Sequence, residues 1–277
     1  MDRIRALAAK KKVLIAAHRG VCGGNIPWNT LQSFEIALRQ GADIVEIDVS
    51  VTKDRKLFVF HPGCEPFHLR IDRYISDMTA EEASQLKFVN SDQTPSQYPV
   101  SPLDDVFELL KNRCIINVDK YWDAIPEITA AIRRHGIEDQ VIVKTGFDMN
   151  CFKAIEEVAP DLPYMPVLDQ KDEATEILRK MNINLLGAEV LFDNEDAEVA
   201  SPEYIEKMHK MGLLLWVNPI VYNYKADLVA SHNDDKAMTE NMDDNWGWLI
   251  DRGFDILQTD WTLPMRIYRE MRAANGK

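Results

Sequence analysis

Two acidic residues spaced two apart lie in a segment that is otherwise apolar. Glu46 and Asp48 alternate with valine and isoleucine within residues 44–51. Residues two apart in a β-strand point to the same face, so both carboxylates would share one side of a largely hydrophobic strand. A solvated face is the alternative, but burying two like charges without a cation is costly. We therefore predict a divalent metal site with oxygen ligands, to which Asp119 would add a third carboxylate.

Eight short apolar segments position these and other polar residues. They lack polar alternation, which is typical of strands buried on both faces. The segments are 13–17, 44–51, 115–119, 141–144, 164–168, 185–191, 213–218 and 256–260. Helical patterns lie between them, so the sequence favours a closed (β/α)8 barrel of the TIM type over an open doubly wound sheet.

A ninth apolar segment breaks this alternation. Residues 57–61 follow the second strand after little more than Lys53-Asp54-Arg55-Lys56, a connection that is too short for a parallel crossover and predicts an antiparallel hairpin. We expect one barrel domain over residues 1–277. Residues 62–100 would form an insertion with little strand pattern, and residues 219–244 a long loop after the seventh strand.

The carboxyl ends of barrel strands meet at one mouth, where active sites are built. We expect His18, Arg19 and His61 to lie there with the acidic residues. The candidate substrate contacts are Asn29, Lys144, Glu189 and Trp216. Each also has a structural interpretation: His18 as a hydrogen-bonded loop residue, Lys144 with Glu189 as an internal ion pair, and Trp216 as packing. The run of residues 232–235, His-Asn-Asp-Asp, resembles a ligand cluster but is more simply a solvated loop.

Composition narrows the class of protein. The 277 residues carry a net charge of −13, which disfavours nucleic acid and anionic membranes as partners. The four cysteines form no Cys-x-x-Cys pair, which indicates free thiols in a reducing compartment. No segment has the length of a signal peptide core or a membrane span, so we expect a cytoplasmic protein without stable membrane insertion.

Several motifs together resemble the glycerophosphodiester phosphodiesterase family. They are His18-Arg19-Gly20, Pro27-Trp28-Asn29-Thr30, Gly41-Ala42-Asp43, Val45-Glu46-Ile47-Asp48-Val49, Thr52-Lys53-Asp54, Val59-Phe60-His61, Trp216-Val217-Asn218 and Ile256-Leu257-Gln258-Thr259-Asp260. The resemblance implies a TIM-type barrel with an antiparallel hairpin and a small insertion after the second strand. It also implies a divalent cation, Mg or Ca, and hydrolysis of glycerophosphodiesters to glycerol 3-phosphate and an alcohol.

The resemblance assigns roles to particular residues. It implies that His18 and His61 are the catalytic acid and base in either order, and that Arg19 binds phosphate. It implies that Glu46, Asp48 and Asp119 hold the metal ion. The nucleophile is either water or the substrate's own 2-hydroxyl group.

The sequence departs from the family pattern at four positions. Trp28 stands where the family commonly has Glu, Arg55 where the hairpin turn has Gly, and Pro62 where Asp follows the histidine. Lys120 follows Asp119 directly, whereas the family's lysine comes two residues after the acid. We expect Lys120 to point to the opposite face and Lys144 to supply the cation in its place.

Two other functions remain open. One is a related barrel phospholipase, of the phosphatidylinositol-specific phospholipase C type or another metal-dependent lipid enzyme. The sequence shows no exposed aromatic or basic patch, which favours a small, soluble glycerophosphodiester. The other is a phosphodiester-binding protein without activity, which the altered positions 28, 62 and 120 would support. Exposed helix faces are also compatible with a homo-oligomer.

Overall fold

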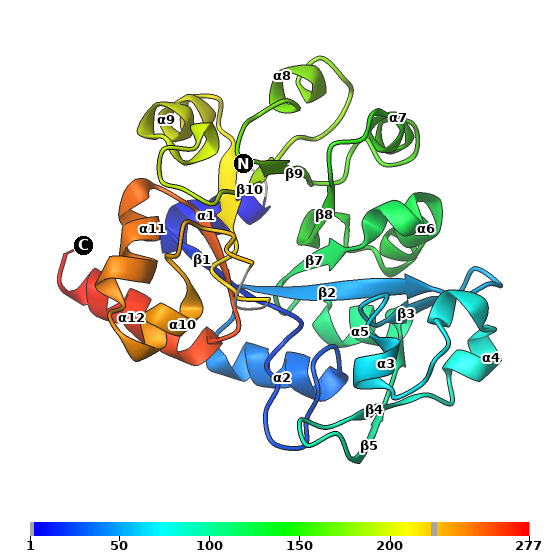
Figure 1. Ribbon diagram of the computed structural model, residues 1–277. Helices are drawn as coiled ribbons and strands as arrows, with labels where there is room; N and C mark the ends of the chain where they lie inside the picture. The colour runs from blue at the N-terminus through cyan, green and yellow to red at the C-terminus, as the bar shows by residue number, and fades with distance from the viewer. Residues whose placement is uncertain (1–2, 223–225, 277) are drawn as a thin grey trace.

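Eight parallel strands close into a barrel in the computed structural model, which describes residues 3–222 and 226–276 (Figure 1). The first strand pairs with both the second and the last, so the predicted TIM-type barrel is confirmed and the open sheet is excluded. The barrel strands are β1 (Leu14–Ala17), β2 (Ile44–Val51), β7 (Ile115–Asp119), β8 (Val141–Thr145), β9 (Tyr164–Asp169), β10 (Gly187–Leu191), β11 (Leu214–Val217) and β12 (Ile256–Thr259).

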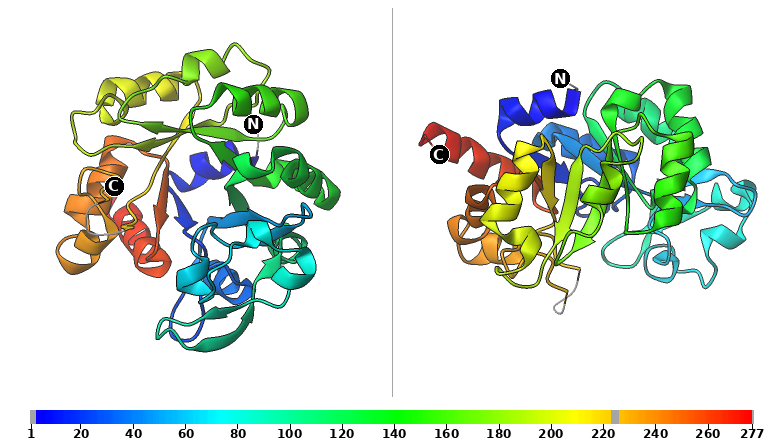
Figure 2. Two further views of the ribbon diagram at one scale, coloured as in Figure 1. Left: turned by 45° about the vertical axis from the view of Figure 1, so that its right-hand side comes forward. Right: turned by 90° about the horizontal axis from the view of Figure 1, so that it is seen from above.

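Helices lie outside the strands and bury their apolar stripes against them (Figure 2). The helices that alternate with the strands are α2 (Leu31–Gln40), α5 (Leu103–Leu110), α6 (Ile125–His135), α7 (Met149–Val158), α8 (Thr175–Leu178), α9 (Pro202–Lys210), α11 (Trp248–Arg252) and α12 (Thr262–Ala274). The Thr30 side chain caps the start of α2, and Gly41 ends the helix in the left-handed conformation. Helix α8 has only four residues, and the Asp172 carboxylate accepts hydrogen bonds from the backbone N–H groups of Ala174 and Thr175 at its start.

The predicted hairpin is present, since β3 (Leu57–Val59) pairs antiparallel with the end of β2. Arg55 adopts the left-handed φ of 60° in the connecting turn, the conformation that glycine accommodates most easily. A short strand, β6 (Ser101–Pro102), continues this sheet.

Residues 62–100 contain more regular structure than the sequence predicts. They form α3 (Glu65–His68), a 3-10 turn (Ile75–Asp77), α4 (Ala80–Ala83) and a two-stranded sheet of β4 (Lys87–Val89) and β5 (Pro95–Pro99). The sequence pattern does not predict this sheet, because β4 has only three residues and β5 begins and ends with proline. This segment, cyan in Figure 2, lies beside α2, and its Ile75 and Phe88 form a separate apolar cluster with Phe60 of the hairpin.

The amino-terminal helix α1 (Arg3–Lys11), which no sequence pattern predicts, packs at one end of the barrel. Its Ile4 and Ala8 join the inward-facing Leu14, Ile115 and Trp216 in one buried cluster. The polar inward residues therefore gather toward the other end, where the carboxyl ends of the strands lie.

The segment after β11 was predicted to be irregular over 219–244, but it contains the short helix α10 (Asp234–Thr239). A π-helical turn (Asp243–Gly247) then leads into α11. Residues 223–225 of the predicted loop, and positions 1–2 and 277 at the chain ends, lie outside the described residues. Within the described residues, no helix is both long and apolar enough to cross a bilayer.

Candidate active site

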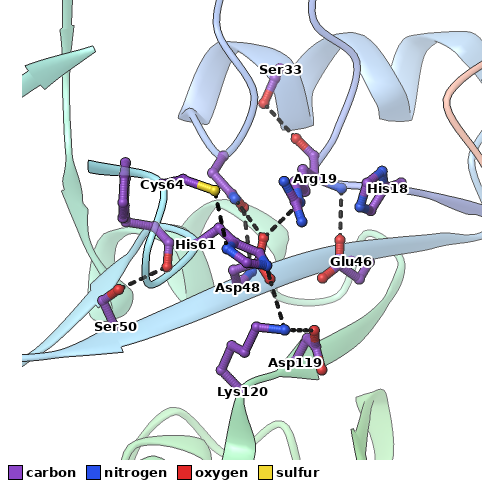
Figure 3. A network of polar contacts seen from close by, with 12 residues as sticks. His18, Arg19, Ser33, Glu46, Asp48, Ser50, His61, Cys64, Asp119 and Lys120 are labelled. Carbon is purple, nitrogen blue, oxygen red and sulfur yellow. Dashed lines mark hydrogen bonds and ion pairs between the residues drawn. The ribbon is translucent and has the colours of Figure 1, made fainter. Parts of the chain in front are cut away.

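Three carboxylates from two neighbouring strands meet at the barrel mouth (Figure 3). Strands β2 and β7 are paired in register, with Asp48 beside Asp119 and Glu46 one layer deeper. One carboxylate oxygen from each of the three residues lies within 4.8 Å of the chosen oxygens of the other two. Because residues two apart share a face of a strand, Glu46 and Asp48 both point inward, as predicted.

The electrostatics of this trio favour a cation. Burial and repulsion from Asp48 and Asp119 raise the pKa of Glu46 well above its ordinary value. Burial would also raise the pKa of Asp119, but the charge and hydrogen bond of Lys120 hold it below its usual range. Asp48 Oδ1 is buried and accepts no hydrogen bond in the described structure. A hard divalent ion fits such a set of oxygen donors.

Arg19 and Asn29 hold the carboxylates from the loop that follows β1. The Arg19 side chain lies 2.9 Å from Asp48 Oδ2, and its backbone N–H donates to Glu46 Oε2 at 2.8 Å. Asn29 donates to Asp48 Oδ2 at 2.9 Å and accepts from the Asp48 backbone N–H. Both residues have left-handed backbones, with φ of 56° and 55°. The Asn29 amide thus orients Asp48, and its predicted contact with substrate stays a prediction.

The imidazole of His61 faces the trio from the end of the hairpin. Its Nε2 lies 3.9 Å from Asp48 Oδ1, and its Nδ1 lies 3.3 Å from the Sγ atom of Cys64. Burial raises the pKa of the Cys64 thiol, so a neutral group orients the ring. Burial, with the charges of Arg19 and Lys120 adding to it, lowers the pKa of His61 although Asp48 opposes this shift.

The other histidine, His18, is held by the last barrel strand. Its Nδ1 lies 2.9 Å from Asp260 Oδ1, and its backbone N–H donates to the Thr259 carbonyl. The ring of Tyr222 packs edge-on against the imidazole at 6.0 Å between centroids. Figure 3 shows His18 beside Arg19 and Glu46, so the two predicted histidines flank one group of carboxylates.

Lys120 points toward the trio, and the expectation that it faces away was wrong. Its Nζ lies 2.9 Å from Asp119 Oδ2 and 4.0 Å from Asp48 Oδ1 (Figure 3). The alternation of a strand does not extend to this residue, because β7 ends at Asp119 and Lys120 turns into the left-handed region with a φ of 60°.

Lys144, Glu189 and Trp216 form a second, deeper network. Lys144 is 1% exposed and donates to Glu189 Oε2 at 2.5 Å, with its ammonium over the Trp216 ring. Asn218 donates to Glu189 Oε1 at 2.6 Å and accepts from the Trp216 indole N–H. These contacts correspond to the internal ion pair and the packing role that the sequence left open, and contact of these residues with substrate stays a prediction.

Sequence reasoning gave no role to two groups that orient the histidines, Asp260 and Cys64. Asp260 follows the last strand, which pairs with the first strand in a closed barrel. This pairing could have predicted that Asp260 lies near His18. Cys64 carried no signal, because its contact depends on the turn after His61.

The run at 232–235 is neither a ligand cluster nor simply solvated. The His232 ring stacks on Trp248 with 4.0 Å between centroids, and its Nε2 contacts Glu195. Asp234 is buried and hydrogen-bonded within the fold. Across residues 3–222 and 226–276, the trio of Glu46, Asp48 and Asp119 is the one group of three or more ligating side chains close enough to share an ion.

Known proteins share this sequence pattern and fold. The model of the glycerophosphoryl diester phosphodiesterase family matches residues 18–262. A glycerophosphodiester phosphodiesterase of Caldanaerobacter subterraneus is 28% identical over 159 residues, which cover 54% of this chain and 65% of that protein.

Two solved structures show the same fold. A glycerophosphoryl diester phosphodiesterase from Parabacteroides distasonis superposes with a TM-score of 0.72 and 20% identity, covering 90% of this chain and 82% of that one. An Oleispira antarctica phosphodiesterase, solved with its product sn-glycerol 3-phosphate, has a TM-score of 0.67 and 17% identity, covering 98% and 99%. With a family match over most of its length, the chain belongs to the glycerophosphoryl diester phosphodiesterase family.

Proposed function

We propose that this protein hydrolyses glycerophosphodiesters to glycerol 3-phosphate and an alcohol. The observation that carries the proposal is the placing of two imidazoles and a guanidinium around three clustered carboxylates at the barrel mouth. The product found in the Oleispira antarctica relative supports the same substrate class.

Glu46, Asp48 and Asp119 would hold a divalent cation, for which Mg or Ca is the best match to three carboxylates. When bound, such an ion would neutralise negative charge that develops on the phosphate oxygens. Arg19 would bind the remaining phosphate oxygens through its planar fork of donors, and Lys120 adds a second positive charge nearby. These local charges offset the net charge of −13 for an anionic substrate.

Both histidines are arranged for proton transfer through the same ring atom. In each, Nδ1 faces a partner: the Asp260 carboxylate for His18 and the Cys64 thiol for His61. Nε2 is therefore the atom left to exchange protons with substrate. One imidazole would take a proton from the attacking hydroxyl, and the other would protonate the leaving alkoxide.

The test is release of glycerol 3-phosphate from glycerophosphocholine by purified variants. We expect His18→Ala and His61→Ala each to lower kcat by about a hundredfold or more, since each removes a proton-transfer group. His209→Ala, which removes a surface imidazole paired with Asp255, is the matched control and should retain activity. Near-normal turnover by either active-site variant would reject the proposal. An inactive wild-type protein that still binds the diester would favour the non-catalytic alternative.

A second candidate substrate is a lipid-linked phosphodiester, as in the phospholipase alternative. Four exposed aromatic side chains closely follow the carboxyl ends of barrel strands: Trp122, Phe147, Tyr222 and Trp261. If the substrate is a lipid, we expect these side chains to contact its apolar part. Trp261→Ala would then lower turnover of lysophosphatidylcholine more than of glycerophosphocholine, whereas Ile267→Ala, an exposed apolar residue on α12, would change neither. Equal effects on both substrates would reject this candidate.

A further inference from the structure

A residue in the long segment after β11 is linked to His18 through two successive hydrogen bonds. His18 contacts the Asp260 carboxylate, and the backbone N–H of Asp260 in turn donates to Asp234 Oδ2 at 2.9 Å. Asp234 is the first residue of α10, from a segment far from His18 in sequence. Asp234 belongs to the His-Asn-Asp-Asp run at 232–235, which resembles a ligand cluster in the sequence. The proposed reaction does not use this run.

Asp234 fixes the end of the last barrel strand. It is 2% exposed, and its oxygens accept from three donors. Oδ2 accepts from the Thr259 hydroxyl at 2.8 Å as well as from Asp260, and Oδ1 accepts from the Trp246 indole at 2.8 Å. The Asp234 backbone N–H also donates to the Pro219 carbonyl, which ties the start of α10 to the end of β11.

The hydrogen bond from the Asp260 backbone N–H to Asp234 matters because Asp260 lies just beyond the end of β12. Strand β12 ends at Thr259, so no strand hydrogen bond fixes the backbone of Asp260. Its side chain is partly exposed, and its Oδ1 must still lie 2.9 Å from His18 Nδ1. The hydrogen bond from the Asp260 N–H to Asp234 therefore fixes the backbone that carries this carboxylate toward the imidazole.

We propose that Asp234 is a positioning residue for the reaction, which holds Asp260 so that its carboxylate orients the His18 imidazole. The inference rests on the proposed function, because it requires His18 to transfer a proton. Asp234 does not touch the substrate, so its effect should fall on the chemical step. Orientation errors of this kind cost rate, because proton transfer needs the acceptor atom in place.

The experiment compares steady-state kinetics of variants on glycerophosphocholine. Asp234→Asn keeps the size of the side chain but replaces one oxygen by an amide nitrogen, which cannot accept a hydrogen bond from any of the three donors, and Asp234→Ala removes both acceptors. We expect each to lower kcat by about ten- to a hundredfold with KM changed less than about twofold. Trp246→Phe is the matched control: it removes the donor to Oδ1 but leaves the Asp260 contact, so kcat should stay near that of the wild type. If Asp234→Ala fails to fold, Asp234→Asn decides.

A double-mutant cycle separates positioning from general loosening of the fold. If Asp234 acts through Asp260, then Asp260→Asn should already remove its benefit, and the double variant should be no slower than Asp260→Asn alone. Multiplying effects, or a kcat of Asp234→Asn equal to that of Trp246→Phe, would overturn the inference. His18→Ala distinguishes the two proposals: an active His18→Ala enzyme rejects the proposed function, whereas an inactive one with unaffected Asp234→Asn rejects this inference alone.

Discussion

Replacing Lys144 by methionine tests whether the deeper network is structural. The ammonium of Lys144 lies within the barrel, 2.5 Å from Glu189 Oε2 and over the Trp216 ring. Burial lowers the pKa of Lys144, while the Glu189 carboxylate opposes that shift. Methionine matches the length of the aliphatic stem, so the substitution removes the charge with little change in packing.

The expected cost follows from what remains behind. Without Lys144, Glu189 keeps its hydrogen bond from Asn218 but loses its counter-charge while largely shielded from solvent. Removing one member of a buried ion pair costs about 3–5 kcal/mol. For a chain of this size, that loss lowers Tm by roughly 6–20 °C. The double variant Lys144→Met/Glu189→Gln removes both charges and should recover much of the loss.

Thermal unfolding followed by circular dichroism measures these differences. Lys210→Met is the control, because Lys210 pairs with Glu206 at 2.7 Å on an exposed helix surface. Such a pair contributes about 0–1 kcal/mol, so this variant should unfold within a few degrees of the wild type. If Lys144→Met leaves Tm unchanged and instead raises KM for glycerophosphocholine, then the ion pair is not structural. Lys144 would then be a phosphate contact, as the sequence suggested.

Three further outcomes are expected. Chelation by EDTA should abolish activity until Mg²⁺ or Ca²⁺ is added, and Asp48→Asn should raise the metal concentration needed for rescue; activity in EDTA would exclude the metal role. Lys120→Met should raise KM and lower kcat, since it removes a charge 2.9 Å from Asp119; unchanged kinetics would return Lys120 to a structural role. Burial and the nearby Asp260 raise the pKa of Asp234 from 3.8 to about 8. The folded state therefore binds the extra proton between these values, so wild-type stability relative to Asp234→Asn should fall as pH rises through this range; a flat difference, as expected for the exposed Asp235→Asn, would contradict the shift.

The barrel could be predicted because its strands are buried on both faces. Segments such as 44–51 and 115–119 are continuous apolar runs, and a parallel sheet needs no other local signal. Helix α1 was missed for the opposite reason. Its charged sequence gives only a weak pattern, and its role depends on Ile4 and Ala8 reaching a barrel interior built by distant residues.

The site could be predicted where strand periodicity extends and not beyond it. The three carboxylates follow from alternation on β2 and β7 and from the pairing of these strands. Groups that orient them lie past the strand ends, where alternation no longer fixes direction. The contact of Cys64 with His61 and that of Asp234 with Asp260 both depend on turns whose conformation no periodicity specifies.

Lys120 shows why spacing alone is a poor guide to the position of a charge. A lysine one residue after an inward acid faces outward in a continuing strand, but here the strand stops at the acid and the next residue is left-handed. That conformation costs a non-glycine residue about 1–2 kcal/mol. The charge-assisted hydrogen bond from the ammonium to Asp119 offsets much of this cost. The Lys120 ammonium thus reaches a place beside Asp119 through a different backbone path. In the same way, Cys64 orients His61 where the resemblance leads one to expect an acidic neighbour. A departure from a family's spacing therefore argues against activity only when the side chain also leaves the site, and neither of these two does.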